Sequence, residues 1–409
     1  MNKILAHAFV LLTGVGLMSP AYGTNASALF GFDQIWKLVQ KNSSELNAVD
    51  HEKQAAEIAS ARAHRHWFPK IYATGRVFST NDSASSFISV LGQRKINSFD
   101  FAPAALNEPS REFYQQGTLG IDLPLFEGGV KFAMATAAAK ASESKEFHAQ
   151  AARLTEFATA ASQYASLLAY VEERKQLENL KVRVEDVLEK YTVGSRSNPV
   201  GYSGLLGLRN LRNRIEGLLV ASSAKTEVKK NDLIASAKEL PTDFSVKTER
   251  TKDFLSKVFT VQKQEATPLV VLAAHSGAEA LEQSKYAERA RFLPRVGVFA
   301  QGDLYRGDRA TATSTTAGAY LQWELFSATS FGAVSEAAHT AAAAQARADG
   351  IQRQFESRRL GAISGVFATE RAIALLDESA VMLEDQTNTA KTLFRNGSIN
   401  ALQLVEVLS

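Results

Sequence analysis

Two histidines, His64 and His66, come closest in this chain to a metal-binding motif. Residues two apart do not face the same way on a helix, so we expect both on a helix surface rather than on a metal ion. The chain has no cysteine, which excludes disulfides, thiolate metal sites and a cysteine nucleophile. We find no phosphate-binding loop, no zinc-ligand spacing and no nucleophile beside a suitable base. The sequence therefore predicts no catalytic, cofactor-binding or metal-binding residues, and it predicts that the protein is not an enzyme.

The composition is that of a nearly neutral chain that folds. Of 409 residues, 45% are hydrophobic and 22% charged, with 46 Lys and Arg against 43 Asp and Glu. Such a chain is expected to have a packed core rather than to be disordered. The small basic excess argues against nucleic acid as a partner, because neutralising many phosphates needs a basic surface. The mean hydropathy of -0.13 by itself argues against a membrane protein, and the strand patterns below reverse that inference.

The N-terminus has the pattern of a secretory signal. Lys3 precedes an apolar run over 4–18, and Ala21 and Gly23 flank Tyr22 as at a signal-peptidase site. We predict a signal peptide over 1–23 and an exported mature chain. The alternative is an uncleaved anchor, but about 15 apolar residues fall short of the roughly 20 that a spanning helix needs.

Internal repetition is the most informative feature of the mature chain. Three short segments occur twice in the same order, namely 67–71 and 292–296, 123–126 and 323–326, and 191–195 and 394–398. Such repetition indicates two equivalent structural units. We predict a first repeat over 24–240, a linker over 241–264 and a second repeat over 265–409. About 25 extra residues in the first repeat are assigned to a long loop over 80–115, rich in Ser, Asn and Pro.

Each repeat is predicted to contain a helix, a β-hairpin, a long helix and a return helix. The hairpins are placed at 69–126 and 294–326, and the long helices at 130–193 and 328–396. In the first hairpin Leu119, Ile121 and Leu123 alternate with polar or small residues, as in strands with one apolar face. Each strand has about ten residues, the length that crosses a bilayer at a tilt. The long helices, near 95 Å at 1.5 Å per residue, must pack laterally along their length.

A coiled-coil seam is predicted near the end of each long helix. Apolar residues step by three and four at Leu177, Leu180, Val184, Val187 and Tyr191. The equivalent positions in the second repeat are Ala380, Leu383, Thr387, Ala390 and Phe394. Gly350, Gly361 and Gly365 share one face of the second helix, which favours close helix contact there.

An exported chain with two membrane-length hairpins faces a closure problem. Four strands cannot form a barrel, and lipid does not tolerate open sheet edges. Copies of the chain are therefore predicted to close the sheet together, and strand counting leaves eight strands from two chains or twelve from three. The alternative is an ordinary soluble sheet attached to an ordinary coiled coil.

The doubled motifs resemble those of the TolC-like outer-membrane efflux protein family over essentially the whole mature chain. The resemblance rests on Leu-Phe-x-Gly-Gly at 125–129, degenerate at 325–332, on Tyr-x-x-Gly at 191–194, repeated with Phe394 and Gly397, and on the helix-Pro-strand junctions. It implies a mainly α protein with membrane β: a homotrimer with a twelve-stranded barrel in outer-membrane lipid and a long α-helical barrel across the periplasm. It also implies a periplasmic adaptor protein and an inner-membrane transporter as partners, and no cofactor.

The resemblance also assigns residues at the tunnel tip. Gln403 and Glu406 match a pair of acidic positions that form the narrowest ring of the entrance, so one carboxylate per chain is retained and one is replaced by an amide. A solvated helix-surface glutamate is the alternative for Glu406. Adaptor docking is assigned to the tip turns, which are Gly194, Ser195, Arg196, Ser197, Gly397 and Ser398. From the residues themselves, Gly194 and Gly397 are expected to end the long helices, and Asn400 with Gln403 forms a capping box.

The junctions between strands and helices carry aromatic residues, prolines and glycines. These residues are Trp67, Pro69, Gly128, Gly129, Pro294 and Trp323. An inner aromatic girdle at the membrane interface is predicted from Trp67, Phe68, Phe292 and Trp323, and core packing at the junction is the alternative.

Only 12 residues follow Gly397, whereas the first return helix extends about 45 residues past Gly194. We therefore expect the second return helix to be truncated. The leading function is an exit duct for an efflux pump or a type I secretion system, and the alternative is a periplasmic or cell-surface coiled-coil scaffold without a pore.

Overall fold

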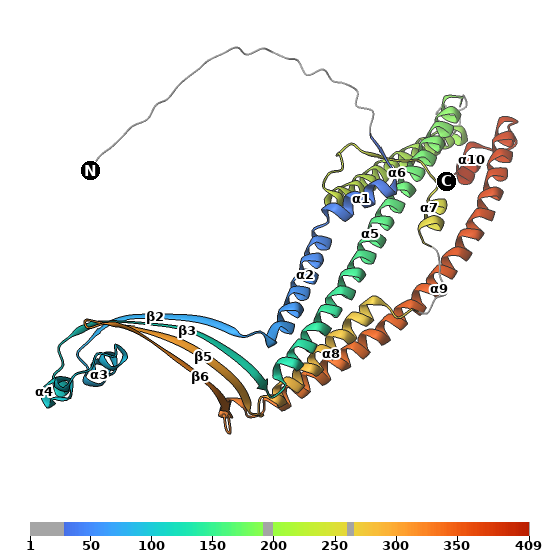
Figure 1. Ribbon diagram of the computed structural model, residues 1–409. Helices are drawn as coiled ribbons and strands as arrows, with labels where there is room; N and C mark the ends of the chain where they lie inside the picture. The colour runs from blue at the N-terminus through green and yellow to red at the C-terminus, as the bar shows by residue number, and fades with distance from the viewer. Residues whose placement is uncertain (1–27, 191–198, 260–265, 409) are drawn as a thin grey trace, which may run out of the picture.

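The computed structural model describes residues 28–190, 199–259 and 266–408 and has an elongated shape (Figure 1). A curved β-sheet forms one end, and a bundle of long helices forms the other. The predicted signal peptide over 1–23 lies outside the described residues, as do Gly194, Ser195, Arg196 and Ser197 of the first tip turn. No helix in the described part of the chain is long and apolar enough to cross a membrane.

The main sheet contains four antiparallel strands in the order β2-β3-β5-β6. Their bounds are Lys70–Thr80 for β2, Glu112–Glu127 for β3, Arg295–Arg306 for β5 and Thr311–Gln322 for β6. The two hairpins lie side by side because β3 pairs with β5, with Leu119 opposite Gly302. β2 and β6 are the edges, so the described chain has an open sheet and no closed barrel.

The last predicted strand is shorter than expected. β6 ends at Gln322, whereas the alternating pattern predicted a strand through Leu325. The reason lies in its partner: β5 begins at Arg295, which pairs with Gln322, so residues 323–326 have no neighbouring strand. The equivalent part of β3 remains a strand because Glu127 pairs with Arg295.

The long loop predicted over 80–115 is partly helical. It contains α3 (Ser83–Gly92), the 3-10 helix η2 (Ser98–Phe101) and α4 (Pro103–Asn107). Asp82 caps α3, since its carboxylate accepts a hydrogen bond from the Ser85 amide at 2.8 Å. Pro103 occupies the first turn of α4, where its missing N–H costs nothing. We call residues 81–111 the insert.

The helical region is built around two long helices, α5 (Val130–Glu189) and α9 (Ala333–Arg395). Both begin after a glycine in the left-handed region, Gly129 with φ +87° and Gly332 with φ +89°, which confirms that the degenerate motif repeats the same turn. α5 packs against α2 (Ser44–His64), α6 (Pro199–Ala237) and α8 (Leu269–Ala290), and α9 packs mainly against α8.

The segment predicted as a linker is folded into the largest core. β4 (Ser245–Val246) pairs in parallel with β1 (Leu29–Phe30), and α7 (Thr251–Val258) follows. Phe244 and Phe254 are buried with Tyr164 of α5 and with residues of α1 (Phe32–Asn42). The linker interpretation of 241–264 is therefore wrong for 244–258, because the aromatic side chains of this polar stretch pack against α5.

A second core joins the helix tips. It contains Val184 of α5, Leu211 and Ile215 of α6, Ala390 of α9, and Leu404 of α10 (Ala401–Leu408). Leu177, Leu180 and Val187 are packed against this core, so the predicted seam is confirmed on α5 from Leu177 to Val187, and Tyr191 lies outside the described residues. On α9 the predicted seam is confirmed only at its last two positions, Ala390 and Phe394.

The rest of the α9 seam is uncovered in the single chain. Leu383 and Ala380 are exposed, and so are all residues over 352–386. Nothing lies within 4 Å of a β-carbon built at Gly350, Gly361 or Gly365. The predicted close helix contact is therefore not made within one chain.

Candidate channel and its two ends

The four-stranded sheet has one apolar face and one polar face. Side chains that share a face follow from the strand register. The apolar face carries Ile71, Ala73, Val77, Leu119, Ile121, Leu123, Val298, Ala300, Ala317, Ala319 and Leu321, and it becomes polar only toward the turn between β5 and β6, with Gln115, Arg306, Thr311, Thr313 and Thr315. The polar face carries Arg76, Gln116, Thr118, Asp122, Gln301, Asp303, Ser314 and Thr316, together with the aromatic residues Tyr72, Phe78, Tyr114, Phe299, Tyr305 and Tyr320. Such a sheet suits a boundary between an apolar medium and water.

Hydrogen bonds connect neighbouring strands on the polar face. The Thr118 hydroxyl donates to an Asp303 carboxylate oxygen at 2.7 Å, and the Gln301 amide donates to the other at 3.2 Å. Tyrosine rings also cover glycines here: a β-carbon at Gly120 would overlap the Tyr72 ring. The same holds for Gly297 and Tyr320 in the second hairpin, so both hairpins use the same packing.

The junction residues lie where the strands meet the helices. Trp67 ends the 3-10 helix η1 (Arg65–Trp67) before Pro69 and is 63% exposed. Trp323 follows β6, is 55% exposed and donates its indole N–H to the Phe292 carbonyl at 3.1 Å. This exposure disagrees with the alternative of a junction core within one chain. It is compatible with the girdle.

Glycines allow the chain to turn tightly at these junctions. Gly128 has φ +67°, and a β-carbon there would overlap the Ala290 carbonyl oxygen. Gly128 and Gly129 thus place the end of β3 against the end of α8. Pro294 precedes β5 as Pro69 precedes β2.

The tip of the second repeat has the predicted caps. Gly397 has φ +72°, and the Ser398 amide donates to the Leu393 carbonyl at 2.8 Å, as in a Schellman motif. The capping box is confirmed: the Asn400 amide donates to the Gln403 side chain and the Gln403 amide donates to the Asn400 side chain, both at 3.0 Å. The Gln403 side chain is therefore engaged at the start of α10. Glu406 lies on the exposed side of the same helix.

A cation-rich cavity beside this tip was missed by the sequence analysis. Its volume is about 820 Å³, and α5, α6, α9 and α10 contribute to its lining. Arg183, Lys391 and Arg395 form no ion pair among the described residues, whereas Asp186 pairs with Lys190. Burial lowers the pKa of the Lys391 ammonium, and Arg183 and Arg395 lower it further. No sequence signal could have found this cavity, because its cations come from two repeats.

The histidine pair forms no metal site. Nδ1 of His64 lies 2.9 Å from the backbone carbonyl oxygen of Ser60. Nδ1 of His66 lies 2.8 Å from the backbone carbonyl oxygen of Ala63. Among the described residues no group of three His, Asp or Glu side chains is placed to hold a metal ion.

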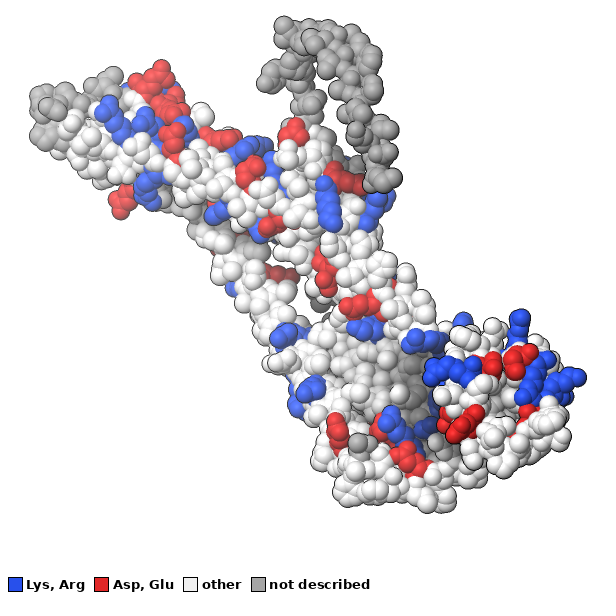
Figure 2. Space-filling view, turned by 90° about the vertical axis from the view of Figure 1, so that its left-hand side faces the viewer, with Lys and Arg blue, Asp and Glu red and all other residues white. Residues whose placement is uncertain are grey.

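Charges of both signs are intermixed on the face seen in Figure 2, without a continuous basic surface.

No protein-family profile matches the chain, and no curated protein matches it. Solved structures do. CusC, from a study of transmembrane channel formation, superposes with a TM-score of 0.74 at 12% identity, over 95% of this chain and 89% of CusC. The outer membrane protein VceC of Vibrio cholerae gives 0.71 at 15% identity, over 92% of this chain and 89% of VceC. The Campylobacter jejuni CmeC outer membrane channel gives 0.68 at 14% identity, over 98% of this chain and 88% of CmeC.

The chain thus has the fold of these outer-membrane proteins and channels. The resemblance to the TolC-like family is confirmed at the level of the fold, and the mainly helical fold class is confirmed with it. These neighbours are channels rather than enzymes.

Proposed function

We propose that this protein is an exit duct in the outer membrane, with its helices in the periplasm. The observation that carries the proposal is the sheet, which is apolar on one face and polar on the other and is attached to helices of 60 and 63 residues. At 1.5 Å per residue these helices are roughly 90 Å long. The apolar face would meet lipid, and the polar face would line water.

The open edges of the sheet support assembly from several copies. β2 and β6 each have one neighbour, so the other side of each leaves backbone groups unpaired, at a cost of several kcal/mol per group in lipid. Pairing β6 of one copy with β2 of the next removes both edges. Three copies would give twelve strands, the arrangement that the TolC-like resemblance implies.

Docking is proposed at the tips of the helices. The tip turns, with Gly397 and Ser398 in the described part, are the proposed contact for a periplasmic adaptor that links the duct to an inner-membrane transporter. The adjacent cation-rich cavity has an apolar lining that includes Val187, Phe394 and Leu404. It would favour a partner surface with carboxylates beside apolar side chains. The duct would serve an efflux pump or a type I secretion system.

The entrance is proposed to be weakly cation-selective. In a trimer, three Glu406 carboxylates would converge near the axis, and bound cations would relieve their repulsion. Gln403, used as a helix cap, adds no charge. We expect a Glu406→Gln channel to lose part of its cation preference, with reversal potential in a salt gradient as the measurement. Unchanged selectivity would assign Glu406 to a solvated helix surface.

Conductance in a planar bilayer tests the duct. We expect stable conductance steps from the detergent-extracted protein, whereas a water-soluble rod without conductance would support the pore-free scaffold.

A matched pair of variants tests which face meets lipid. Leu119→Lys on the apolar face should reduce insertion, since a midplane lysine costs about 2–4 kcal/mol. Gln116→Lys on the polar face should insert normally.

A further inference from the structure

The insert lies at the end of the sheet farthest from the helices (Figure 1), and the following contacts place it on the polar face. Tyr114 of β3 shares this face with Thr118 and is only 2% exposed, because α3 covers it. A β-carbon at Gly92, the last residue of α3, would overlap the Tyr305 ring of β5, whose side chain is on the same face as Asp303. The insert therefore covers the side of the sheet that the proposed duct would turn toward its lumen.

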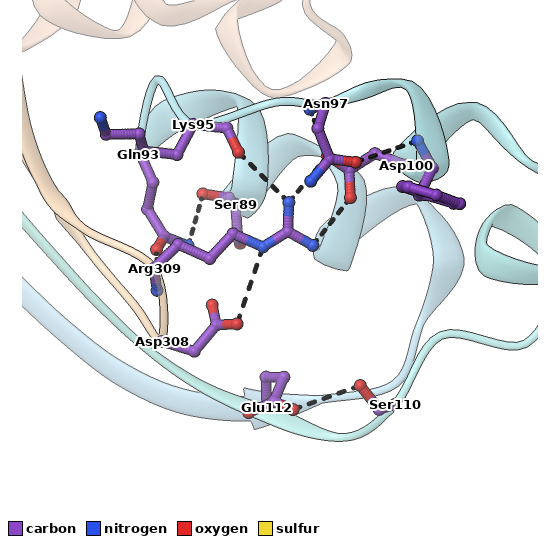
Figure 3. A network of polar contacts seen from close by, with 10 residues as sticks. Ser89, Gln93, Lys95, Asn97, Asp100, Ser110, Glu112, Asp308 and Arg309 are labelled. Atoms are coloured by element: carbon purple, nitrogen blue, oxygen red, sulfur yellow. Dashed lines mark hydrogen bonds and ion pairs between the residues drawn. The ribbon is translucent and has the colours of Figure 1, made fainter.

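Polar contacts attach the insert to the turn between β5 and β6 (Figure 3). The Arg309 guanidinium forms an ion pair with Asp100 at 2.7 Å and donates to the Lys95 carbonyl at 3.2 Å. The Gln93 side chain is 1% exposed, and its carbonyl accepts the amides of Arg309 at 2.9 Å and Ala310 at 3.0 Å. We call Gln93, Asp100 and Arg309 the latch.

The latch connects the insert with the turn between β5 and β6, at the end of the sheet farthest from the helices. Gln93 and Asp100 are each more than 200 positions from Arg309 in the sequence. Packing of the insert is otherwise incomplete, since Ile88, Leu91 and Phe99 are exposed. A segment held largely by a few polar contacts can open at a smaller free-energy cost than one held by an apolar core.

We propose that the insert is a lid that narrows the exit of the duct, and that the latch determines how large a molecule passes. This inference rests on the proposed function, because the polar face must line the lumen. In a closed barrel of several copies, the inserts would converge from different sides on the same opening. Specificity at this end would then depend on the size of the molecule rather than on its chemistry.

Thiol labelling tests the latch. The chain has no cysteine, and Ser86 of α3 is only 4% exposed, so Ser86→Cys introduces one reporter under the lid. We expect a charged maleimide to label it slowly, and about tenfold faster after Arg309→Gln or Asp100→Asn, since the lid would open more often. Arg306→Gln removes the same charge three residues away and should leave the rate unchanged. Equal rates in all variants would overturn the latch.

Conductance tests the lid. We expect Arg309→Gln to raise single-channel conductance about 1.5-fold or more and to admit larger polyethylene glycols, with Arg306→Gln unchanged. Cysteines at positions 93 and 307, where the Gln93 side-chain amide lies against Gly307, should hold the lid shut when oxidised and release it when reduced. If the protein conducts, but its conductance does not change with the latch substitutions or with oxidation of this disulfide, the lid proposal is wrong and the proposed duct is unaffected. If no variant conducts, the duct fails, and the exit role of the lid fails with it.

Discussion

α5 and α9 occupy equivalent positions in the two repeats but differ in how much of their surface the rest of the chain covers. α5 has twelve buried residues, from Ala133 to Val184, because α2, α6 and α8 pack along it. α9 has only Ala341, Ala348 and Ala390 buried. Both helices are rich in alanine and share a seam register, so the difference lies in their surroundings. α6 packs along α5, whereas α9 packs mainly against α8.

The uncovered part of α9 is apolar enough to need a partner. Its exposed side chains include Ile363, Val366, Phe367, Leu376, Val381, Met382 and Leu383. Apolar side chains that stay exposed over this length of helix favour a further contact. The comparison therefore shows that α5 is covered within one chain, and we predict that α9 is covered in an assembly.

The sharpest test places the same charge on both seams. Val184→Asp buries a carboxylate in the core of the α5 tip and should cost several kcal/mol, so the protomer tip unfolds. Leu383→Asp, on exposed α9, should leave the helicity of the protomer unchanged and abolish the oligomer. Circular dichroism and light scattering separate these outcomes. If the Leu383→Asp variant still forms the oligomer, the α9 seam is not covered by assembly.

A second test concerns what covers α5 at its middle. Phe254 of α7 packs against Tyr164 with ring centroids 4.9 Å apart and is buried. Phe254→Ala should lower the free energy of unfolding by about 3–5 kcal/mol. The neighbouring Leu255 is 37% exposed, and Leu255→Ala should cost much less. Equal losses in denaturant titrations would mean that this segment is a linker after all.

A third test uses the Tyr164 hydroxyl, which is buried on α5 and has no hydrogen-bond partner in the described part of the chain. Tyr164→Phe should therefore stabilise the protein, by about 1–3 kcal/mol. Burial also raises the pKa of Tyr164 to about 12. Since the unfolded phenol ionises near pH 10, this residue makes the wild type lose stability as the pH rises from about 10 to 12. Tyr164→Phe should lack that part of the loss in melts across this range. If it melts earlier than the wild type at pH 8, the hydroxyl has a partner.

The hairpins and the caps at the second tip were predictable, because each depends on residues close together in the sequence. Asn400 and Gln403 are three apart, and the Gly332 turn copies the Gly129 turn. The β1 and β4 pair was not predictable, since Leu29 and Ser245 meet only through tertiary packing and each strand has two residues. The latch was missed for the same reason, because Gln93 and Arg309 lie in different repeats. The contact that covers the rest of the α9 seam stays a prediction, because the pattern specifies a contact without saying which chain supplies it.

The smallest expected effect concerns the glycines of α9. A β-carbon at Gly361 meets nothing in the single chain, so Gly361→Ala should stabilise an isolated protomer by about 0.5–1 kcal/mol through helix propensity. In the oligomer the same methyl group would separate helices that approach closely, so association should weaken. Gly217, in the middle of α6, also has open space around it and is the matched control, for which Gly217→Ala should stabilise without changing assembly. Thermal melts at several protein concentrations measure both terms, because only an association effect depends on concentration. Stabilisation by Gly361→Ala at every concentration would show that this face of α9 stays in water.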